Sequence, residues 1–201
     1  MQMKKVLLLD LGGVLADLAS PAESMRLSMT NDEFWQIWLN SASVAAYETG
    51  RIDLEIFSQS ISTELGIADA DDVIERFQSW QLSVFPGVER ILGQAANQFR
   101  LALLSNTNPT HWEQIRSSSR LCEIFEKLFL SFETGTFKPE RAAFTQVLDY
   151  FKCPVEDVFF LDDSASNVAA ACSLGIQAAQ VMGSQQLEMT IDRIATEDVI
   201  T

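Results

Sequence analysis

The first apolar segment of the chain, Val6-Leu7-Leu8-Leu9, constrains the fold most, because it runs directly into the carboxylate of Asp10. A short, continuous apolar run of this kind is typical of a strand buried on both faces of a parallel sheet. In such sheets the binding site lies at the carboxyl ends of the strands. The segment therefore predicts that Asp10 stands at the edge of the sheet and faces a crevice. An acidic residue at this place can also have a purely structural role in a turn. The prediction of a site therefore needs further polar residues from later segments.

Strand and helix patterns alternate from residue 86 onward. The helices are expected at 87–97, after Asn108-Pro109, after Pro139 as first helical residue, and at 165–174. The strands are expected at 101–104, 128–130, 158–161 and 176–181. This alternation predicts an α/β fold with a Rossmann-like parallel sheet core that is flanked by helices. The last dozen residues are weakly patterned, and no element is assigned to them.

Residues 17–85 show helical patterns only. Thr30-Asn31-Asp32-Glu33 is a capping-box pattern that precedes apolar residues at helical spacing. Another apolar stripe begins at Leu54 and stops at Gly66. The block is therefore expected to be an inserted α-helical cap (17–85), and residues 1–16 and 86–201 form the α/β core.

Composition excludes several classes of function. The formal net charge is −14 without a basic cluster, whereas a protein that binds nucleic acid needs a positive face. The chain has no apolar run long enough to span a membrane, and the opening run is too short for a secretory signal. Its three cysteines (Cys122, Cys153 and Cys172) are odd in number and widely spaced. They are expected to be reduced core thiols of a cytoplasmic protein.

Four segments carry polar residues that a parallel sheet could bring together. They contain Asp10, the pair Ser105-Asn106, Lys138 and the doublet Asp162-Asp163. Each has a structural alternative: serine and asparagine commonly cap helices, and a single lysine is usually solvated. A cap needs only one carboxylate, so the Asp162-Asp163 doublet is the hardest feature to explain structurally.

These residue types together indicate phosphoryl chemistry. Neighbouring carboxylates repel one another unless a hard cation lies between them, and Mg²⁺ prefers oxygen ligands. With their charge screened, Asp10 could attack phosphorus and form an aspartyl-phosphate. Ser105, the backbone amides that follow it and Lys138 would bind the phosphoryl oxygens. Gly12 and Gly13 would allow the backbone near Asp10 to turn tightly.

The four segments, in this order and with this insertion, resemble the haloacid dehalogenase-like hydrolase superfamily over essentially the whole chain. The sequence is most similar to the branch that includes small sugar-phosphate phosphatases and the phosphatase domain of soluble epoxide hydrolase. The resemblance implies that Asp10 is nucleophile and metal ligand, and that the Gly12 carbonyl is a further ligand. It makes Asp163 the main acidic ligand of Mg²⁺, with Asp162 as a ligand or beside one. Ser105, Asn106, Lys138 and His111 are the expected substrate-binding residues, and Ser105 and Lys138 also act in catalysis.

One departure from the family pattern concerns proton transfer. The first motif of the family is D-x-D, and its second aspartate is the usual general acid/base, but this chain has Gly12 there. Such a group is typically worth ~10²–10⁴-fold in rate. Its loss allows a slower phosphatase, one that uses another group, or an inactive protein. His111 could reach the leaving group, although a structural or substrate-orienting role is the commoner one for such a histidine.

Two other functions depend on similar sequence features. A Rossmann dinucleotide site needs G-x-G-x-x-G, and Gly12-Gly13 lacks the third glycine. A 2-haloacid dehalogenase also uses an aspartate nucleophile, but it works without metal, and the Asp162-Asp163 doublet argues against it.

The cap would exclude water and contact the remainder of the substrate. Trp35, Trp38 and the segment 47–51 are candidates for these contacts. The tryptophans can equally pack the cap's own core, and Arg51 can meet an anionic substrate or lie at the surface.

The prediction is an Mg²⁺-dependent phosphatase of a small phosphorylated metabolite, with no nucleic-acid or membrane partner. Oligomeric state and the substrate itself are left open. The alternative is a non-catalytic phospho-ligand-binding or regulatory protein that lost its acid at Gly12.

Overall fold

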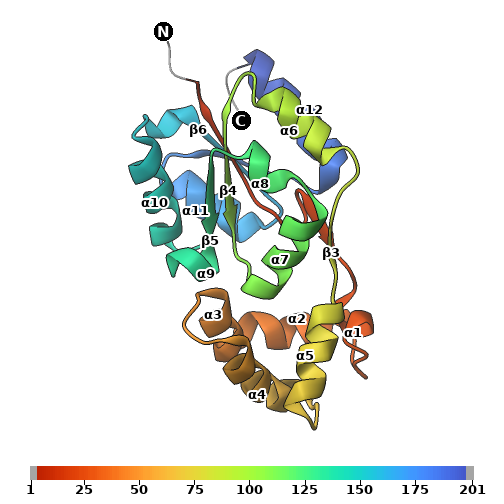
Figure 1. Cartoon of the computed structure of the whole chain (residues 1–201). Coiled ribbons are helices and arrows are strands. Elements are labelled where there is room, and N and C mark those ends of the chain that lie inside the picture. Colours follow the sequence, from red (N-terminus) through yellow and green to blue (C-terminus); the bar gives the residue numbers. More distant parts are fainter. Residues whose placement is uncertain (1–3, 198–201) are drawn as a thin grey trace.

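A parallel sheet forms the centre of the protein, whose computed structural model describes residues 4–197 (Figure 1). Its strands are β1 (Val6–Leu9), β4 (Arg100–Ser105), β5 (Lys127–Leu130), β6 (Val158–Asp162) and β7 (Gln177–Gln180). They lie in the order β5-β4-β1-β6-β7, and every neighbouring pair is parallel. The first strand therefore lies in the middle, with the ends of β4 and β6 beside its own. The predicted α/β, Rossmann-like sheet core is confirmed.

Both faces of the sheet are buried, which explains why its strands are continuously apolar. Leu7 and Leu9 of β1 point into one hydrophobic cluster, and Val6 and Leu8 point into another on the opposite face. The first cluster is completed by α6 (Val88–Ala95), α7 (Pro109–Ser118), α8 (Leu121–Ile124) and α12 (Gly183–Glu197). The second is completed by α10 (Arg141–Phe151) and α11 (Ala165–Ser173). The 3₁₀ turn η1 (Val155–Asp157) leads into β6.

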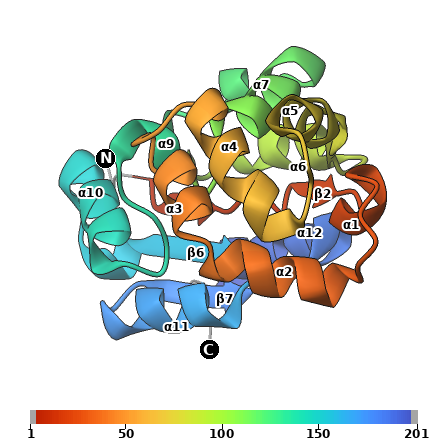
Figure 2. The ribbon, with the colours of Figure 1, turned by 90° about the horizontal axis from the view of Figure 1, so that it is seen from below.

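Five helices between residues 21 and 79 form a separate unit, which we call the cap, below the sheet in Figure 1 and in front of it in Figure 2. They are α1 (Pro21–Ser24), α2 (Asn31–Asn40), α3 (Ala42–Glu48), α4 (Leu54–Leu65) and α5 (Ala70–Ser79). The predicted capping box of Thr30 and Glu33 starts α2, and Gly66 ends α4 in the left-handed conformation. Trp38 is buried and stacks on Phe34 and Phe77, so it packs the cap's own core.

Two short strands join the cap to the core. β2 (Ala16–Leu18) and β3 (Leu82–Val84) pair antiparallel where the chain enters and leaves the cap. The prediction that residues 17–85 contain only helix is therefore wrong at both ends. Three-residue strands are too short to show a period-2 pattern, and the partner of each lies far away in the sequence.

The chain also ends differently from the prediction. Residues 183–197 form α12, although no element was assigned to the last dozen residues; residues 198–201 lie outside the described part of the chain. Leu187, Ile191 and Ile194 bury one face of this helix against the first cluster. Their spacing is helical, but many polar residues around them dilute the pattern.

Two smaller expectations are also wrong. Pro139 does not begin a helix: its peptide bond with Lys138 is cis, Glu140 is the N-cap, and α10 begins at Arg141. The cysteines are unpaired but are not core thiols, because Cys122 and Cys153 are only partly buried and Cys172 is exposed.

Within residues 4–197, no helix is both long and apolar enough to cross a membrane. The cytoplasmic location stays a prediction.

The loop after α3 packs tightly against the core. Gly50 has φ +69°, and a Cβ atom there would overlap the backbone oxygen of Phe132 in α9 (Ser131–Thr134). Gly66 has the same φ with open space around it, which makes it a matched control.

We expect Gly66→Ala to lower the free energy of unfolding by ~1–2 kcal/mol through backbone strain alone. Gly50→Ala should cost ~1–3 kcal/mol more, because the added methyl group also overpacks the cap–core contact. Urea unfolding of both variants measures the difference. Equal losses would contradict the tight contact between this loop and α9.

Candidate active site

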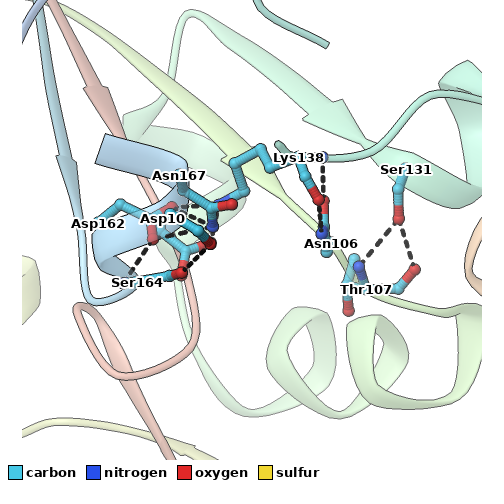
Figure 3. Close-up of polar contacts among 9 residues, drawn as sticks. Asp10, Asn106, Thr107, Ser131, Lys138, Asp162, Ser164 and Asn167 are labelled. Carbon is cyan, nitrogen blue, oxygen red and sulfur yellow. Dashed lines mark hydrogen bonds and ion pairs between the residues drawn. The ribbon is translucent and has the colours of Figure 1, made fainter. Parts of the chain in front are cut away.

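The ends of three neighbouring strands bring the predicted chemical residues together (Figure 3). Asp10 follows β1, Asp162 ends β6, and Ser105 ends β4. Lys138 reaches the same place from the loop before α10, and its Nζ lies 2.6 Å from Asp10 Oδ1 and 2.6 Å from Asp162 Oδ2. The lysine is buried, so the solvated role considered for it does not apply. Residues that are far apart in the sequence thus form one charged cluster.

Asp162 is completely buried and has all its hydrogen bonds within the protein. Its Oδ1 accepts from the Ser164 backbone N–H (2.8 Å) and from Asn167 Nδ2 (3.0 Å). Its Oδ2 accepts from Lys138 and, at 3.2 Å, from Asn167. Asp162 therefore holds Lys138 and the turn into α11, which fits a place beside the metal ligands.

The carboxylates can hold a cation. Asp10, Asp162 and Asp163 each offer an oxygen atom, and these atoms lie within 4.8 Å of one another. Asp163 is only partly buried, and it lies so close to Gly13 that a Cβ there would overlap its carboxylate. An all-oxygen donor set of this kind fits Mg²⁺. Because Asp162 is already committed, Asp10, Asp163 and the neighbouring Gly12 carbonyl are the groups that fit as ligands.

Burial and crowding dominate the electrostatics of the cluster. Burial raises the pKa of Asp10 to about 7; Lys138 opposes this shift and Asp162 adds to it. Burial also raises the pKa of Asp163, with the charge of Asp162 acting in the same direction. For Lys138, burial disfavours the charge, but the two carboxylates outweigh it and raise its pKa. The cluster is short of positive charge, so a further cation beside Asp10 would favour its ionised, nucleophilic form.

The loop after β4 is fixed by its own hydrogen bonds. Asn106 donates from Nδ2 to the Lys138 carbonyl and accepts from the Lys138 N–H through Oδ1, both at 2.8 Å. The Thr107 N–H donates to Ser131 Oγ, so this amide is not free for the predicted phosphoryl contact. Ser105 is buried but lines the cavity beside Asp10. The side chain of Asn106 thus positions Lys138, and its predicted contact with substrate stays a prediction.

A cavity of about 490 Å³ lies between the cap and the strand ends. Its core side includes Asp10, Gly12, Ser105, Lys138 and Asp163. Its cap side is mainly apolar and includes Trp35, Trp38, Leu39, Val44 and Trp80, with one acidic side chain, Glu48. Both tryptophans named from the sequence line the cavity. Arg51 does not line it and is exposed, in agreement with the surface position that was its alternative.

His111 joins the core to the cap. Asn108 caps α7 as predicted, accepting from the His111 N–H, and the imidazole packs against Phe77 and Trp80. The ring lines the cavity, but its Nε2 is buried and forms no hydrogen bond with any residue of the described range 4–197. Burial lowers the pKa of His111 to about 4, so it is neutral at pH 7. These contacts agree with the structural role; a contact with substrate stays a prediction.

Two residues of the site were not given a role from the sequence. Ser131 follows β5 and locks the Thr107 loop by donating to the Thr107 carbonyl at 2.9 Å. It obeys the same strand-end rule as Asp10 and could have been found by it. Glu48 lies in a segment that the sequence singled out, but nothing in the local pattern shows that it faces the cavity.

The sequence and fold match known hydrolases. The sequence profile of the haloacid dehalogenase-like hydrolases matches residues 4–175. A HAD family enzyme from Bacteroides thetaiotaomicron, solved in complex with magnesium and inorganic phosphate, is 27% identical, with a TM-score of 0.74 over 89% of this chain and 94% of that one. A predicted HAD-like hydrolase from Porphyromonas gingivalis shares the fold at 23% identity, with a TM-score of 0.80 over 98% of this chain and 100% of that one.

Two further similar proteins are a cyclase and a dehalogenase. A drimenol cyclase from Aspergillus calidoustus is 29% identical over 198 residues, and the match covers 96% of this chain but 37% of the cyclase. The chain thus spans little more than a third of that protein. The L-2-haloacid dehalogenase of Xanthobacter autotrophicus has the same fold at 19% identity, with a TM-score of 0.68 over 89% of this chain and 78% of that one.

The depressed pKa of His111 predicts acid sensitivity. Between about pH 6.5 and pH 4 the unfolded chain binds a proton at this residue and the folded chain does not, so stability falls as the pH falls. We expect His111→Gln to remove this component, and His111 is the one histidine in the chain. The unfolding free energy of the variant, relative to the wild type, should rise by up to ~3 kcal/mol from pH 7.5 to pH 4. Urea titrations across this range test it, and a constant difference would contradict it.

Proposed function

Because the chain belongs to the haloacid dehalogenase-like hydrolases, we propose that it is an Mg²⁺-dependent phosphatase of a small phosphorylated metabolite. One observation carries the proposal: Asp10 lies at a cavity, next to a buried lysine and two further carboxylates. A carboxylate nucleophile, a cation site and a lysine at one place are what transfer of a phosphoryl group to Asp10 requires.

The residues present divide the reaction into two steps. An Asp10 oxygen forms a bond to phosphorus while the bond to the ester oxygen breaks, and that oxygen leaves with a proton taken from water. Water then cleaves the aspartyl-phosphate, which releases phosphate and regenerates Asp10. Lys138 balances the charge of Asp10 and Asp162 throughout, and Ser105, which lines the cavity, would bind a phosphoryl oxygen.

Asp10, Asp163 and the Gly12 carbonyl would hold the metal ion. A bound Mg²⁺ supplies positive charge that lets an anionic phosphate approach an anionic nucleophile. The Bacteroides relative, crystallised with magnesium and phosphate, supports this choice of ion and ligand. The dehalogenase shares only the fold, and the Asp162-Asp163 doublet argues against its metal-free reaction.

Removal of the nucleophile tests the proposal. We expect Asp10→Asn to lower the rate of phosphate release from p-nitrophenyl phosphate by at least ~10³-fold, because an amide cannot attack phosphorus. Chelation of Mg²⁺ with EDTA should abolish release in the wild type, and added Mg²⁺ should restore it. Asp149→Asn, at an exposed position of α10, is the control that should keep full activity. Phosphate release by the wild type in the presence of EDTA, or by the Asp10→Asn variant, would contradict the proposal.

A second candidate function rests on Gly12. Without an aspartate at this position the usual acid for the leaving oxygen is missing, so the protein could bind a phosphorylated ligand without cleaving it. Binding of phosphate esters with no release, at saturating Mg²⁺, would favour this regulatory role.

An aspartate introduced at position 12 distinguishes a slow phosphatase from a protein without catalytic activity. A Cβ at Gly12 would lie 3.1 Å from Leu18 Cδ1, the flexible end of a side chain, so a substitution needs only a small shift. We expect Gly12→Asp to raise the rate for glycerol 3-phosphate relative to p-nitrophenyl phosphate by ~10²-fold, because a poor leaving group benefits most from an acid. Gly12→Asn has the same shape without the proton, and an equal effect from it would contradict the explanation.

A further inference from the structure

The cap side of the cavity carries almost no charge. Its lining includes Trp35, Leu39 and Val44, together with Trp38 and Trp80, which are almost completely buried. Among the described residues that line the cavity there is one lysine, Lys138, and no arginine, and His111 is neutral at pH 7; both carboxylate partners of Lys138 lie on the core side. A substrate that extends toward the cap therefore meets aromatic surface and no free cation.

Glu48 is the exception in this wall. It is the last residue of α3, is partly buried and lines the cavity. Among residues 4–197 it forms no ion pair; the basic residue nearest in sequence, Arg51, is exposed outside the lining. Burial raises its pKa to about 7, and a hydrogen bond from the Trp38 side chain opposes this shift. A carboxyl group left without a counter-ion in an apolar wall is costly, which points to a ligand that offsets the cost.

We propose that Glu48 selects the leaving group: it accepts a hydrogen bond from a neutral or cationic alcohol portion and excludes a second anionic group. This inference rests on the proposed phosphatase function and assigns its substrate class. The phosphate is bound at the strand ends, and the alcohol portion lies against the tryptophans with a hydroxyl or ammonium group toward Glu48. A leaving group with its own carboxylate or second phosphate would face Glu48 with no cation to offset the repulsion. Rejection of that kind gives specificity without any added attraction.

The aromatic walls add a second requirement. Trp35, which is only partly buried, and the exposed Leu39 favour a leaving group that has an apolar face to place on them, such as a ring. A small, highly charged phosphate ester has no apolar group to cover this surface, which would stay in contact with water. The proposed class is thus a phosphomonoester with an apolar face, at least one hydrogen-bond donor and no second anion.

Three aryl esters of matched shape test the inference at pH 8, where Glu48 is mostly ionised. They are phenyl phosphate, 4-(hydroxymethyl)phenyl phosphate and 4-carboxyphenyl phosphate, and the last two differ in having a hydroxyl or a carboxylate at the same place. In the wild type we expect kcat/KM to be at least ~10-fold higher for the hydroxymethyl ester than for the carboxy ester. Phenyl phosphate, which has neither group, should lie between them.

The variant Glu48→Gln removes the charge and keeps the shape. We expect it to bring the two kcat/KM values within about threefold of one another, mainly by improving the carboxy ester. Glu55→Gln, at an exposed position of α4, is the matched control and should keep the wild-type ratio.

The outcomes separate the two proposals. A wild-type ratio near one, or a ratio that Glu48→Gln leaves unchanged, would overturn the role of Glu48 while the phosphatase function stands. No phosphate release from any of the three esters at saturating Mg²⁺ would overturn both.

Discussion

The buried ammonium group of Lys138 is the interaction on which the site depends. Asp10 and Asp162 end neighbouring strands, so the sheet forces two carboxylates together in a place with little water. The repulsion between them is offset by Lys138, which lies 2.6 Å from each. Removal of one partner from such a buried cluster costs ~3–5 kcal/mol, because the remaining charges lose their compensation. Asn106, which binds both backbone groups of Lys138, holds the lysine where this balance requires it.

The core and its charged cluster were predictable from the sequence because they depend on short patterns of neighbouring residues. Each sheet strand is a continuous apolar run, and in parallel sheets the residues that follow such runs meet at one edge. Asp10, Ser105 and Asp162 could therefore be brought together without coordinates. Lys138 follows no strand; it was placed in the site as a lysine before a predicted helix and by the chemistry that phosphoryl transfer needs, and the family resemblance agreed.

The remaining features depend on contacts between distant segments. β2 and β3 have three residues each and exist because they pair across the whole cap. The side chain of Asn106 bonds to the Lys138 backbone instead of facing outward, and the Thr107 amide is taken by Ser131. Glu48 faces the cavity because α3 packs on the core through Gly50 and Phe132. No pattern within one helix or loop contains this information.

Charge divides the cavity into two parts with different tasks. The strand ends hold three carboxylates, which Lys138 reaches from the loop before α10, so this side suits chemistry that is the same for every phosphate ester. The cap holds one carboxyl group without an ion pair among the described residues, Glu48, in a mainly apolar wall, so in the proposed reaction it would act on whatever is attached to the phosphate. Gly12 lies on the first side, and in the proposed reaction its lack of an acid would make the rate depend more on how well the alcohol departs. A cap that selects the alcohol would therefore influence turnover as well as binding, because Gly12 cannot protonate the leaving group.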